Sequence, residues 1–189
     1  MACSVGPASA GPAVKQQLFL DLARAAERER SPEALAEDER QTWGTPMALF
    51  AGIDAEARFT FDACASPETA KCPDFWTIDD DALAHTWGPE VYWCNYPFAK
   101  ARPWHEKALE AVANGGEAWL LGNISTGAKW FYEVVVPHAD WWTLRGRVAF
   151  VPPLGVMPST NDRDSVLCRY HRGPLRGYMG TRCPKTGRA

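Results

Sequence analysis

The sequence lacks the features of several protein classes. No stretch of its 189 residues reaches the ~18 consecutive apolar residues that a membrane span requires. The N-terminus has neither the basic nor the apolar region of a secretory signal. The 15 glycines and 15 prolines are too few for collagen or general disorder. We therefore expect a soluble, intracellular protein, and its length and 46% hydrophobic content fit one core rather than two.

Spacings typical of metal sites and disulfide frameworks are also absent. No Cys-x-x-Cys pair occurs among the six cysteines, which are Cys3, Cys64, Cys72, Cys94, Cys168 and Cys183. The four histidines show no zinc or triad spacing and are expected at the surface or at helix ends: His85, His105, His138 and His171. No Gly-x-Ser-x-Gly nucleophile elbow is present. We expect reduced thiols and no bound metal.

Charge is distributed unevenly along the chain. Residues 1–100 carry 8 Lys and Arg against 16 Asp and Glu, whereas residues 101–189 carry 12 against 7. Residues 163–189 are especially basic. They contain Asp164 as their one acidic residue, against Arg163, Arg169, Arg172, Arg176, Arg182, Lys185 and Arg188. A basic C-terminal segment of this kind either binds a polyanion or only keeps the protein in solution.

Residues 1–40 are interpreted as an N-terminal extension. Residues 1–13 are small and rich in Pro, Gly and Ala, which predicts disorder. Apolar residues at helical spacing then predict a helix over 14–30, and Ser31-Pro32 opens a short acidic second helix. Nothing in this segment indicates chemistry.

From Trp43 onward the pattern changes to short apolar runs that alternate with helical stretches. Buried strands are predicted over 57–63, 91–94 and 118–121. Between the last two, a helix opens near Pro103 and ends at the Asn114-Gly115-Gly116 turn. A strand, helix and strand at this spacing form a βαβ unit, which implies an open, mostly parallel sheet with flanking helices.

The remainder of the chain continues this α/β pattern. A helix is predicted from about Ser125 or Thr126 to Pro137, and a last, antiparallel C-terminal strand over 164–171. Between them, 139–144 and 147–151 form either an antiparallel pair or one bent strand. Trp141 and Trp142 should then point to opposite faces, and the segment 151–163 is a long exposed loop.

The strand over 91–94 leads into Asn95, Tyr96, Pro97 and Phe98, directly before a helix. In open parallel sheets, ligands bind outside the carboxyl ends of the strands. The Asn95 amide oxygen and the Tyr96 carbonyl can both accept from an exocyclic amine, while the Phe98 ring stacks on a flat base. The alternative is an Asn-initiated turn with core aromatics.

These four residues resemble the Asp/Asn/Ser-Pro-Pro-aromatic signature of amino-group DNA methyltransferases. Further short motifs follow the order of the phage-type Dam DNA N6-adenine methyltransferase family over about residues 41–170. They are Trp43-x-Thr45-Pro46-x-x-Leu49-Phe50, Phe61-Asp62-Ala63-Cys64-Ala65-Ser66-Pro67, Asp79-Asp80-Asp81-x-Leu83 with Trp87, and Gly146-Arg147-Val148-x-Phe150.

The resemblance implies a Rossmann-like methyltransferase fold over 41–171, followed by a basic tail over 172–189. It implies methyl transfer from S-adenosylmethionine to the N6 amine of adenine in DNA. Trp43, Thr45 and Pro46 match the N-terminal cofactor motif, near the methionine moiety. Asp62, with Ala63 and Cys64, resembles the cofactor-strand acid, and either Asp80 or Asp81 would reach the ribose or adenine of the cofactor.

Each acid also has a simpler interpretation, and the sequence departs from the family twice. Asp62 would otherwise cap a turn, and residues 79–81 would otherwise form a solvated acidic face. The Phe-x-Gly-x-Gly loop of many cofactor-binding methyltransferases is missing, and Tyr96 stands where the family has its first proline.

Two other functions fit the same residues. One is N4-cytosine methylation, because cytosine carries a similar amine. The other is DNA binding by a methyltransferase fold that has lost activity. DNA is the expected partner, with no membrane or metal, and the expected location is the cytoplasm of a bacterium or phage-infected host cell. The sequence carries no signal that separates a monomer from a dimer.

Overall fold

The computed structural model describes residues 43–152 and 163–188, which belong to one compact unit. The expected N-terminal extension with its two helices, and most of the loop over 151–163, lie outside these residues. No helix in the described part of the chain is both long enough and apolar enough to cross a bilayer.

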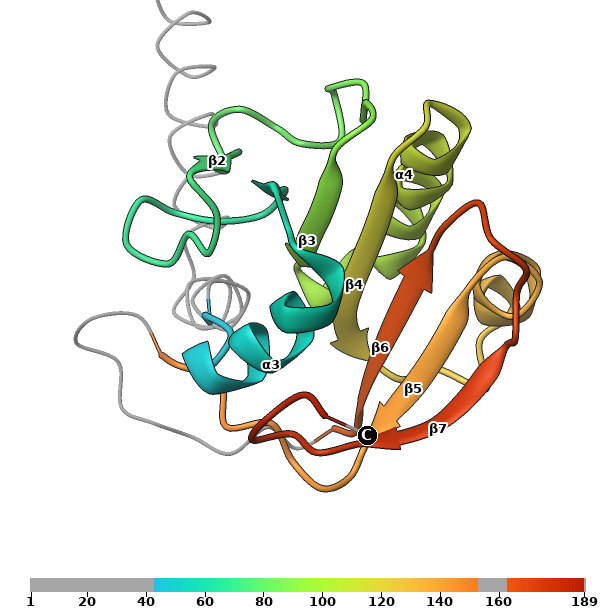
Figure 1. The fold of residues 1–189 in the computed structure, drawn as a ribbon. Helices are drawn as coiled ribbons and strands as arrows, with labels where there is room; N and C mark the ends of the chain where they lie inside the picture. Colours follow the sequence, from blue (N-terminus) through green and yellow to red (C-terminus); the bar gives the residue numbers. More distant parts are fainter. Residues whose placement is uncertain (1–42, 153–162, 189) are drawn as a thin grey trace, which may run out of the picture. The chain divides into compact units, whose positions relative to one another are not determined.

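Within this part of the chain, the strands form one seven-stranded sheet in the order β2-β1-β3-β4-β6-β5-β7 (Figure 1). Strand β6 is antiparallel to both neighbours, whereas the other neighbouring strands pair in parallel. The strands are β1 (Phe61–Asp62), β2 (Asp74–Phe75), β3 (Val91–Asn95), β4 (Glu117–Asn123), β5 (Asp140–Leu144), β6 (Ser165–Tyr170) and β7 (Tyr178–Arg182). This architecture confirms the α/β, Rossmann-like methyltransferase fold.

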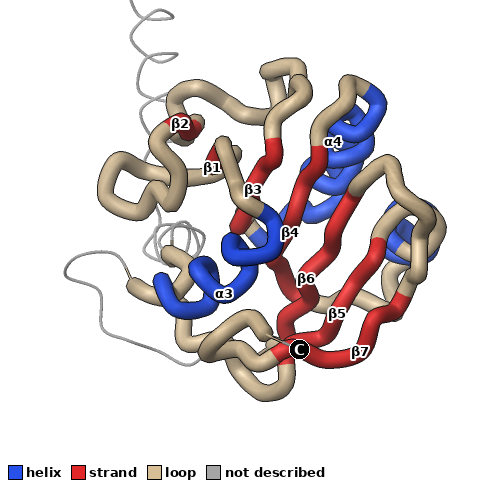
Figure 2. The backbone as a smooth tube through the Cα atoms, viewed as in Figure 1, coloured by secondary structure: helices blue, strands red, loops and turns tan. Residues whose placement is uncertain are grey.

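Helices cover both faces of the sheet (Figure 2). Helix α3 (Met47–Ala57) packs Leu49, Phe50 and Ile53 on one face. Helix α4 (Ala101–Ala113) lies on the other, with the π-helical turn η2 (Phe131–Val135). The central strands are apolar on both sides because both sides are covered, as expected of a parallel sheet.

The βαβ unit is confirmed, and its helix ends where the glycines predicted. Asn114 caps α4, and Gly115 adopts a φ of 99° that favours glycine. The Arg172 side chain donates from Nε and Nη2 to the last carbonyls of α4, at 2.9 Å each.

Trp141 and Trp142 do point to opposite faces of β5. Trp142 is buried and stacks on Trp119, with ring centroids 5.5 Å apart and an interplanar angle of 5°. Trp141 packs on the α4 side, against Phe131 and Tyr178. Each tryptophan is therefore covered by a different layer.

The strand predicted over 57–63 is much shorter than expected. Ala57 ends α3, and only Phe61 and Asp62 pair as β1. Arg58 adopts the left-handed conformation, at φ 57°, and the Phe59 amide bonds the Asp54 side chain at 2.8 Å. The helix stop was missed because an arginine occupies the position that usually holds glycine.

The expected pairing of 139–144 with 147–151 is wrong. Strand β5 is bonded by β6 on one side and by β7 on the other, so neither of its edges is free. Val151 pairs with Gly44 instead, through two 2.8 Å hydrogen bonds. This bridge joins the chain just before α3 to the segment that follows β5.

The segment expected as a basic tail contributes to the folded unit. Residues 178–182 form β7, and the turn that follows packs on α3. A Cβ at Gly52 of α3 would overlap the Thr186 carbonyl, and one at Gly187 would lie 2.7 Å from Ile53. The strand was not predicted because its many basic residues suggested a solvated tail. What holds it in the fold is its pairing with β5 and the packing of the following turn on α3.

Candidate active site

The candidate site lies where the order of the sheet reverses. Strand β1 pairs with β2 on one side and β3 on the other, while β3 continues the sheet to β4. Ligands in open α/β sheets bind at such a switch point, outside the carboxyl ends of the strands. Asp62 ends β1 and Asn95 ends β3, so the structure places both predicted residues at this point.

The Asn95 side chain is held in one orientation with its oxygen unused. Its Nδ2 donates to the Trp43 carbonyl at 2.8 Å. This bond identifies the nitrogen, since a carbonyl accepts only from the amide NH2 group. Oδ1 is buried and has no partner among residues 43–152 and 163–188. A buried acceptor without a partner is costly unless a ligand supplies the donor.

Besides Arg182 Nε on β7, the other buried polar atoms without a partner in the described chain belong to residues at the same edge. They include Trp43 Nε1 and Thr45 Oγ1, in the segment that enters α3, and Asn123 Oδ1, at the carboxyl end of β4. Thr45 is almost fully buried, and Pro46 precedes the first turn of α3. Asn123 was not predicted from the sequence, although a polar residue that ends a buried strand marks this position.

Pro97 and Phe98 turn the chain from β3 into α4. Pro97, at φ −59°, precedes the short 3-10 turn η1 (Phe98–Lys100). The half-buried Phe98 ring lies 5.6 Å from the Phe150 ring, in a T-shaped contact. The structure thus brings the Gly146–Phe150 motif against the Asn95–Phe98 motif.

The Tyr96 side chain points away from Asn95, into the core on the α4 side. It is 1% exposed, and its hydroxyl lies 3.0 Å from His105 Nε2. The expectation that His105 is a surface or helix-end histidine is wrong, because it is fully buried within α4. Its position beside Trp104 on the apolar side of the helix was the available signal.

Asp62 is buried and shapes the loop after β1. Its Oδ2 accepts from the Lys71 amide at 3.0 Å, and its Oδ1 accepts from the Cys64 amide at 3.3 Å. Burial raises the pKa of the carboxyl to about 6, although these hydrogen bonds oppose the shift. Ala63 is buried, and its amide bonds the Trp93 carbonyl at 2.8 Å, which joins β1 to β3.

Asp80 and Asp81 are exposed in the turn after β2. Asp80 Oδ2 accepts from both the amide and the hydroxyl of Thr77, at 2.8 Å each, and these bonds lower its pKa. Asp81 adopts a φ of 51°, and its Oδ1 accepts from the Leu83 amide at 3.3 Å. Both carboxylates therefore order the turn and remain open to solvent.

The thiols close to this site are free and held in their protonated form. All five cysteines in the described ranges are free. Burial raises the pKa of Cys64 and of Cys72 to about 12, so both stay protonated at neutral pH. Across the described residues, no three His, Cys, Asp or Glu side chains are grouped as a metal site would require.

Comparisons with known proteins identify the family of the chain. The family described as DNA N-6-adenine-methyltransferase (Dam) matches residues 33–171. A protein of Escherichia phage T1, named DNA N-6-adenine-methyltransferase, is 26% identical over 146 residues. That match covers 68% of this chain and 61% of the phage protein, so the chain spans less than two thirds of its relative. Because the family match covers most of the chain, including both strands of the candidate site, this protein belongs to the DNA N-6-adenine-methyltransferase (Dam) family.

Proposed function

We propose that this protein transfers a methyl group from S-adenosylmethionine to the N6 amine of adenine in DNA. The observation that carries the proposal is the buried Asn95 Oδ1. The bond from Nδ2 to Trp43 orients it, and no group in the described residues donates a hydrogen bond to it. An exocyclic amine would satisfy it. Adenine rather than cytosine is favoured by the family and by the name of the phage relative.

Asn95 would act on the target nitrogen through two acceptors. Its Oδ1 and the Tyr96 backbone carbonyl would each accept one N–H of the amine. These bonds draw the nitrogen lone pair out of conjugation with the ring, which makes it available for attack. In the transfer the C–S bond to the methyl would break and leave a neutral thioether, and the methylated nitrogen would lose one N–H proton to solvent, so no strongly basic side chain is needed. Phe98 would hold the base by stacking, while Phe150 packs against the Phe98 ring.

The residues at the edge of the sheet fit the cofactor. S-adenosylmethionine, when bound, supplies an electrophilic methyl group on a positively charged sulfur. Trp43 Nε1 and the Thr45 hydroxyl, both buried and without a partner in the part of the chain described, would bind its methionine end with Pro46. Asp62 would contribute with Ala63 and Cys64 by ordering the loop after β1. Asp80 or Asp81 would accept from its ribose or adenine.

DNA would approach the edge at which β3, β4, β5 and β7 end. Four basic residues follow β5 and β7 there: Arg145, Arg147, Lys185 and Arg188. They would pair with phosphates while the target base leaves the stack, at a cost of a few kcal/mol. Arg147 lies 3.1 Å from Asp164, a partner that a phosphate would have to replace or share.

One experiment separates these functions. The purified full chain is incubated with labelled S-adenosylmethionine and unmethylated DNA, and the DNA is then digested to nucleosides. N6-methyl-2′-deoxyadenosine would support the proposal, whereas N4-methyl-2′-deoxycytidine would change the target base. Cofactor and DNA binding without any labelled base would indicate a protein that has lost activity.

A further inference from the structure

A chain of buried hydrogen bonds lies directly beneath the Asn95–Phe98 turn. The Tyr96 hydroxyl lies 3.0 Å from His105 Nε2, and His105 Nδ1 lies 2.7 Å from the Tyr170 hydroxyl. All three side chains are at most 1% exposed. The chain connects the end of β3 to α4 and to β6.

His105, in the middle of these hydrogen bonds, is neutral. Burial lowers its pKa to about 3, so the ring carries one N–H and one bare nitrogen at neutral pH. One tyrosine hydroxyl therefore accepts from the ring and the other donates to it. A neutral ring suits this position because both of its nitrogens have a partner and no charge is buried.

The neighbouring strand leaves space for the Tyr96 ring. Gly122 lies on β4, and a Cβ there would overlap both the hydroxyl and the ring carbon Cζ of Tyr96. The Trp104 ring stacks nearby, with centroids 6.3 Å apart and an interplanar angle of 17°. The Phe98 ring meets the same tyrosine edge-on at 6.0 Å. The ring is thus confined by β4, α4 and η1 together.

We infer that Tyr96 is a positioning residue whose side chain, bonded through His105 to Tyr170, holds the Asn95–Phe98 turn in place for methyl transfer. The inference rests on the proposed function. Tyrosine lacks the fixed φ of proline, so its backbone alone would leave the turn looser. Anchoring the side chain at both ring and hydroxyl restrains the Tyr96 carbonyl and the adjacent Asn95.

The test compares Tyr96→Phe with a matched control, Tyr92→Phe. Tyr92 lies on β3, the strand that Tyr96 directly follows, and in the same core. Its hydroxyl accepts from the Gly88 amide and donates to Glu90, at 2.7 Å each. Tyr92 is near the amino end of β3, away from Asn95. Both variants lose a bonded hydroxyl, but only one of these hydroxyls restrains the turn.

We expect Tyr96→Phe to lower kcat by roughly threefold to tenfold at saturating DNA and cofactor, the usual effect of losing one oriented hydrogen bond. The KM for cofactor should change little. Tyr170→Phe should act in the same direction, and the double variant should lose less than the product of the two effects. Tyr92→Phe should keep kcat within about twofold of wild type. Equal kcat in Tyr96→Phe and Tyr92→Phe would overturn the inference.

A second measurement does not depend on activity. Backbone amides over residues 95–100 should exchange faster in Tyr96→Phe than in wild type, and should be unchanged in Tyr92→Phe. If wild type transfers no methyl group, the proposed function fails and the exchange data alone decide whether the side chain restrains the turn. Unchanged exchange in Tyr96→Phe would then reject the restraint.

Discussion

Asn95 Nδ2 donates to the Trp43 backbone carbonyl at 2.8 Å, across 52 residues of sequence. This bond connects the end of β3 to the segment that enters α3. It orients the amide so that Oδ1 remains available. The indole nitrogen of Trp43, Nε1, also has no partner within the described residues. The proposed base site and the proposed cofactor site therefore share one hydrogen bond.

Replacing Asn95 with Ala should lower methyl transfer by at least ~100-fold, because an oriented group that acts mainly in the transition state is removed. Cofactor affinity, measured by calorimetry, should fall far less than the rate, because Asn95 bonds only the Trp43 carbonyl and leaves Trp43 Nε1 and the Thr45 hydroxyl in place. Asn114→Ala is the matched control, since Asn114 Nδ2 donates to the Trp87 carbonyl at the same 2.8 Å. Wild-type turnover in Asn95→Ala would show that the site is assigned wrongly.

Phe98→Ala should weaken binding of an extruded base by about 1–3 kcal/mol, the usual contribution of stacking on an aromatic ring. Phe98→Tyr and Phe98→Trp should retain most of it. Affinity for DNA carrying an unpaired target base measures the effect, alongside urea unfolding. An equal loss in all three variants, matched by equal destabilisation, would indicate that Phe98 only packs against Phe150.

The pKa of the Asp62 carboxyl should be about 6 in the folded protein, well above the ordinary aspartate value of 3.8. Between these values the folded state binds more protons than the unfolded state. Asp62 therefore favours folding most below pH 4, and this contribution is lost as pH rises through about 6. The loss should total roughly 2–3 kcal/mol.

Carbon NMR of the carboxyl group measures this pKa directly. The stability of Asp62→Asn, taken relative to wild type in urea, should rise between pH 4 and pH 7 because the variant has no titrating group. A difference in stability that does not change with pH would contradict the assignment.

DNA binding should depend on the basic residues after β7 more than on those before it. Lys185 and Arg188 are exposed and follow β7, at the edge where Asn95 lies, whereas the exposed Arg176 precedes β7 at the opposite edge. Removing one basic side chain that binds a phosphate should flatten the slope of log K against log salt by about 0.9. We expect this change for Lys185→Gln and Arg188→Gln. The same change in Arg176→Gln would place DNA elsewhere.

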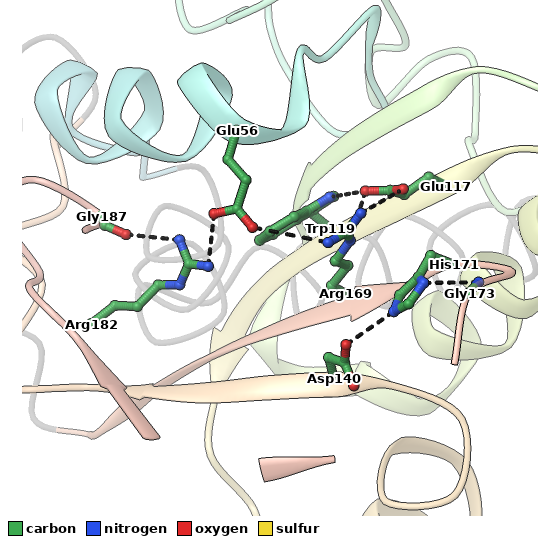
Figure 3. Close-up of polar contacts among 9 residues, drawn as sticks. All are labelled: Glu56, Glu117, Trp119, Asp140, Arg169, His171, Gly173, Arg182 and Gly187. Atoms are coloured by element: carbon green, nitrogen blue, oxygen red, sulfur yellow. Dashed lines mark hydrogen bonds and ion pairs between the residues drawn. The ribbon is translucent and has the colours of Figure 1, made fainter. Parts of the chain in front are cut away.

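Arg182 should contribute to stability rather than to DNA binding, because its side chain is bonded to Glu56 and to Gly187 (Figure 3). Its side chain is 6% exposed and bonds Glu56 at 2.9 Å and the Gly187 carbonyl at 3.1 Å. It also lies over Trp142, 4.1 Å from the ring centroid. Arg182→Gln should lower the free energy of unfolding by about 2 kcal/mol, less than for a fully buried pair because Glu56 is 45% exposed.

The control for Arg182 is Arg102→Gln, which removes an exposed pair with Glu106 and should have little effect on urea unfolding.

Truncation after Tyr170 is a poor test of DNA binding. It would remove β7, the Arg182–Glu56 pair and the Arg172 bonds that end α4. An unfolded product would bind DNA more weakly for reasons unrelated to phosphate contacts.

The sequence by itself determined the local elements and which polar and aromatic residues follow β3. Apolar runs at strand length predicted β3, β4 and β6, and the Asn114-Gly115 stop predicted the end of α4. These signals are local, because they depend on side-chain periodicity and on the conformations that individual residues adopt. Asn95 could be located for the same reason, since it directly follows a predicted strand.

Only the tertiary structure decided which distant residues meet. The bond from Asn95 to Trp43, the burial of His105 between two tyrosines and the pairing of β5 with β7 each join segments far apart in sequence. Arg169 and Arg182, basic residues near the C-terminus, form ion pairs with Glu117 and Glu56 within the fold (Figure 3). A charge or a histidine in a sequence does not specify its partner, because the partner is selected by packing of the whole sheet.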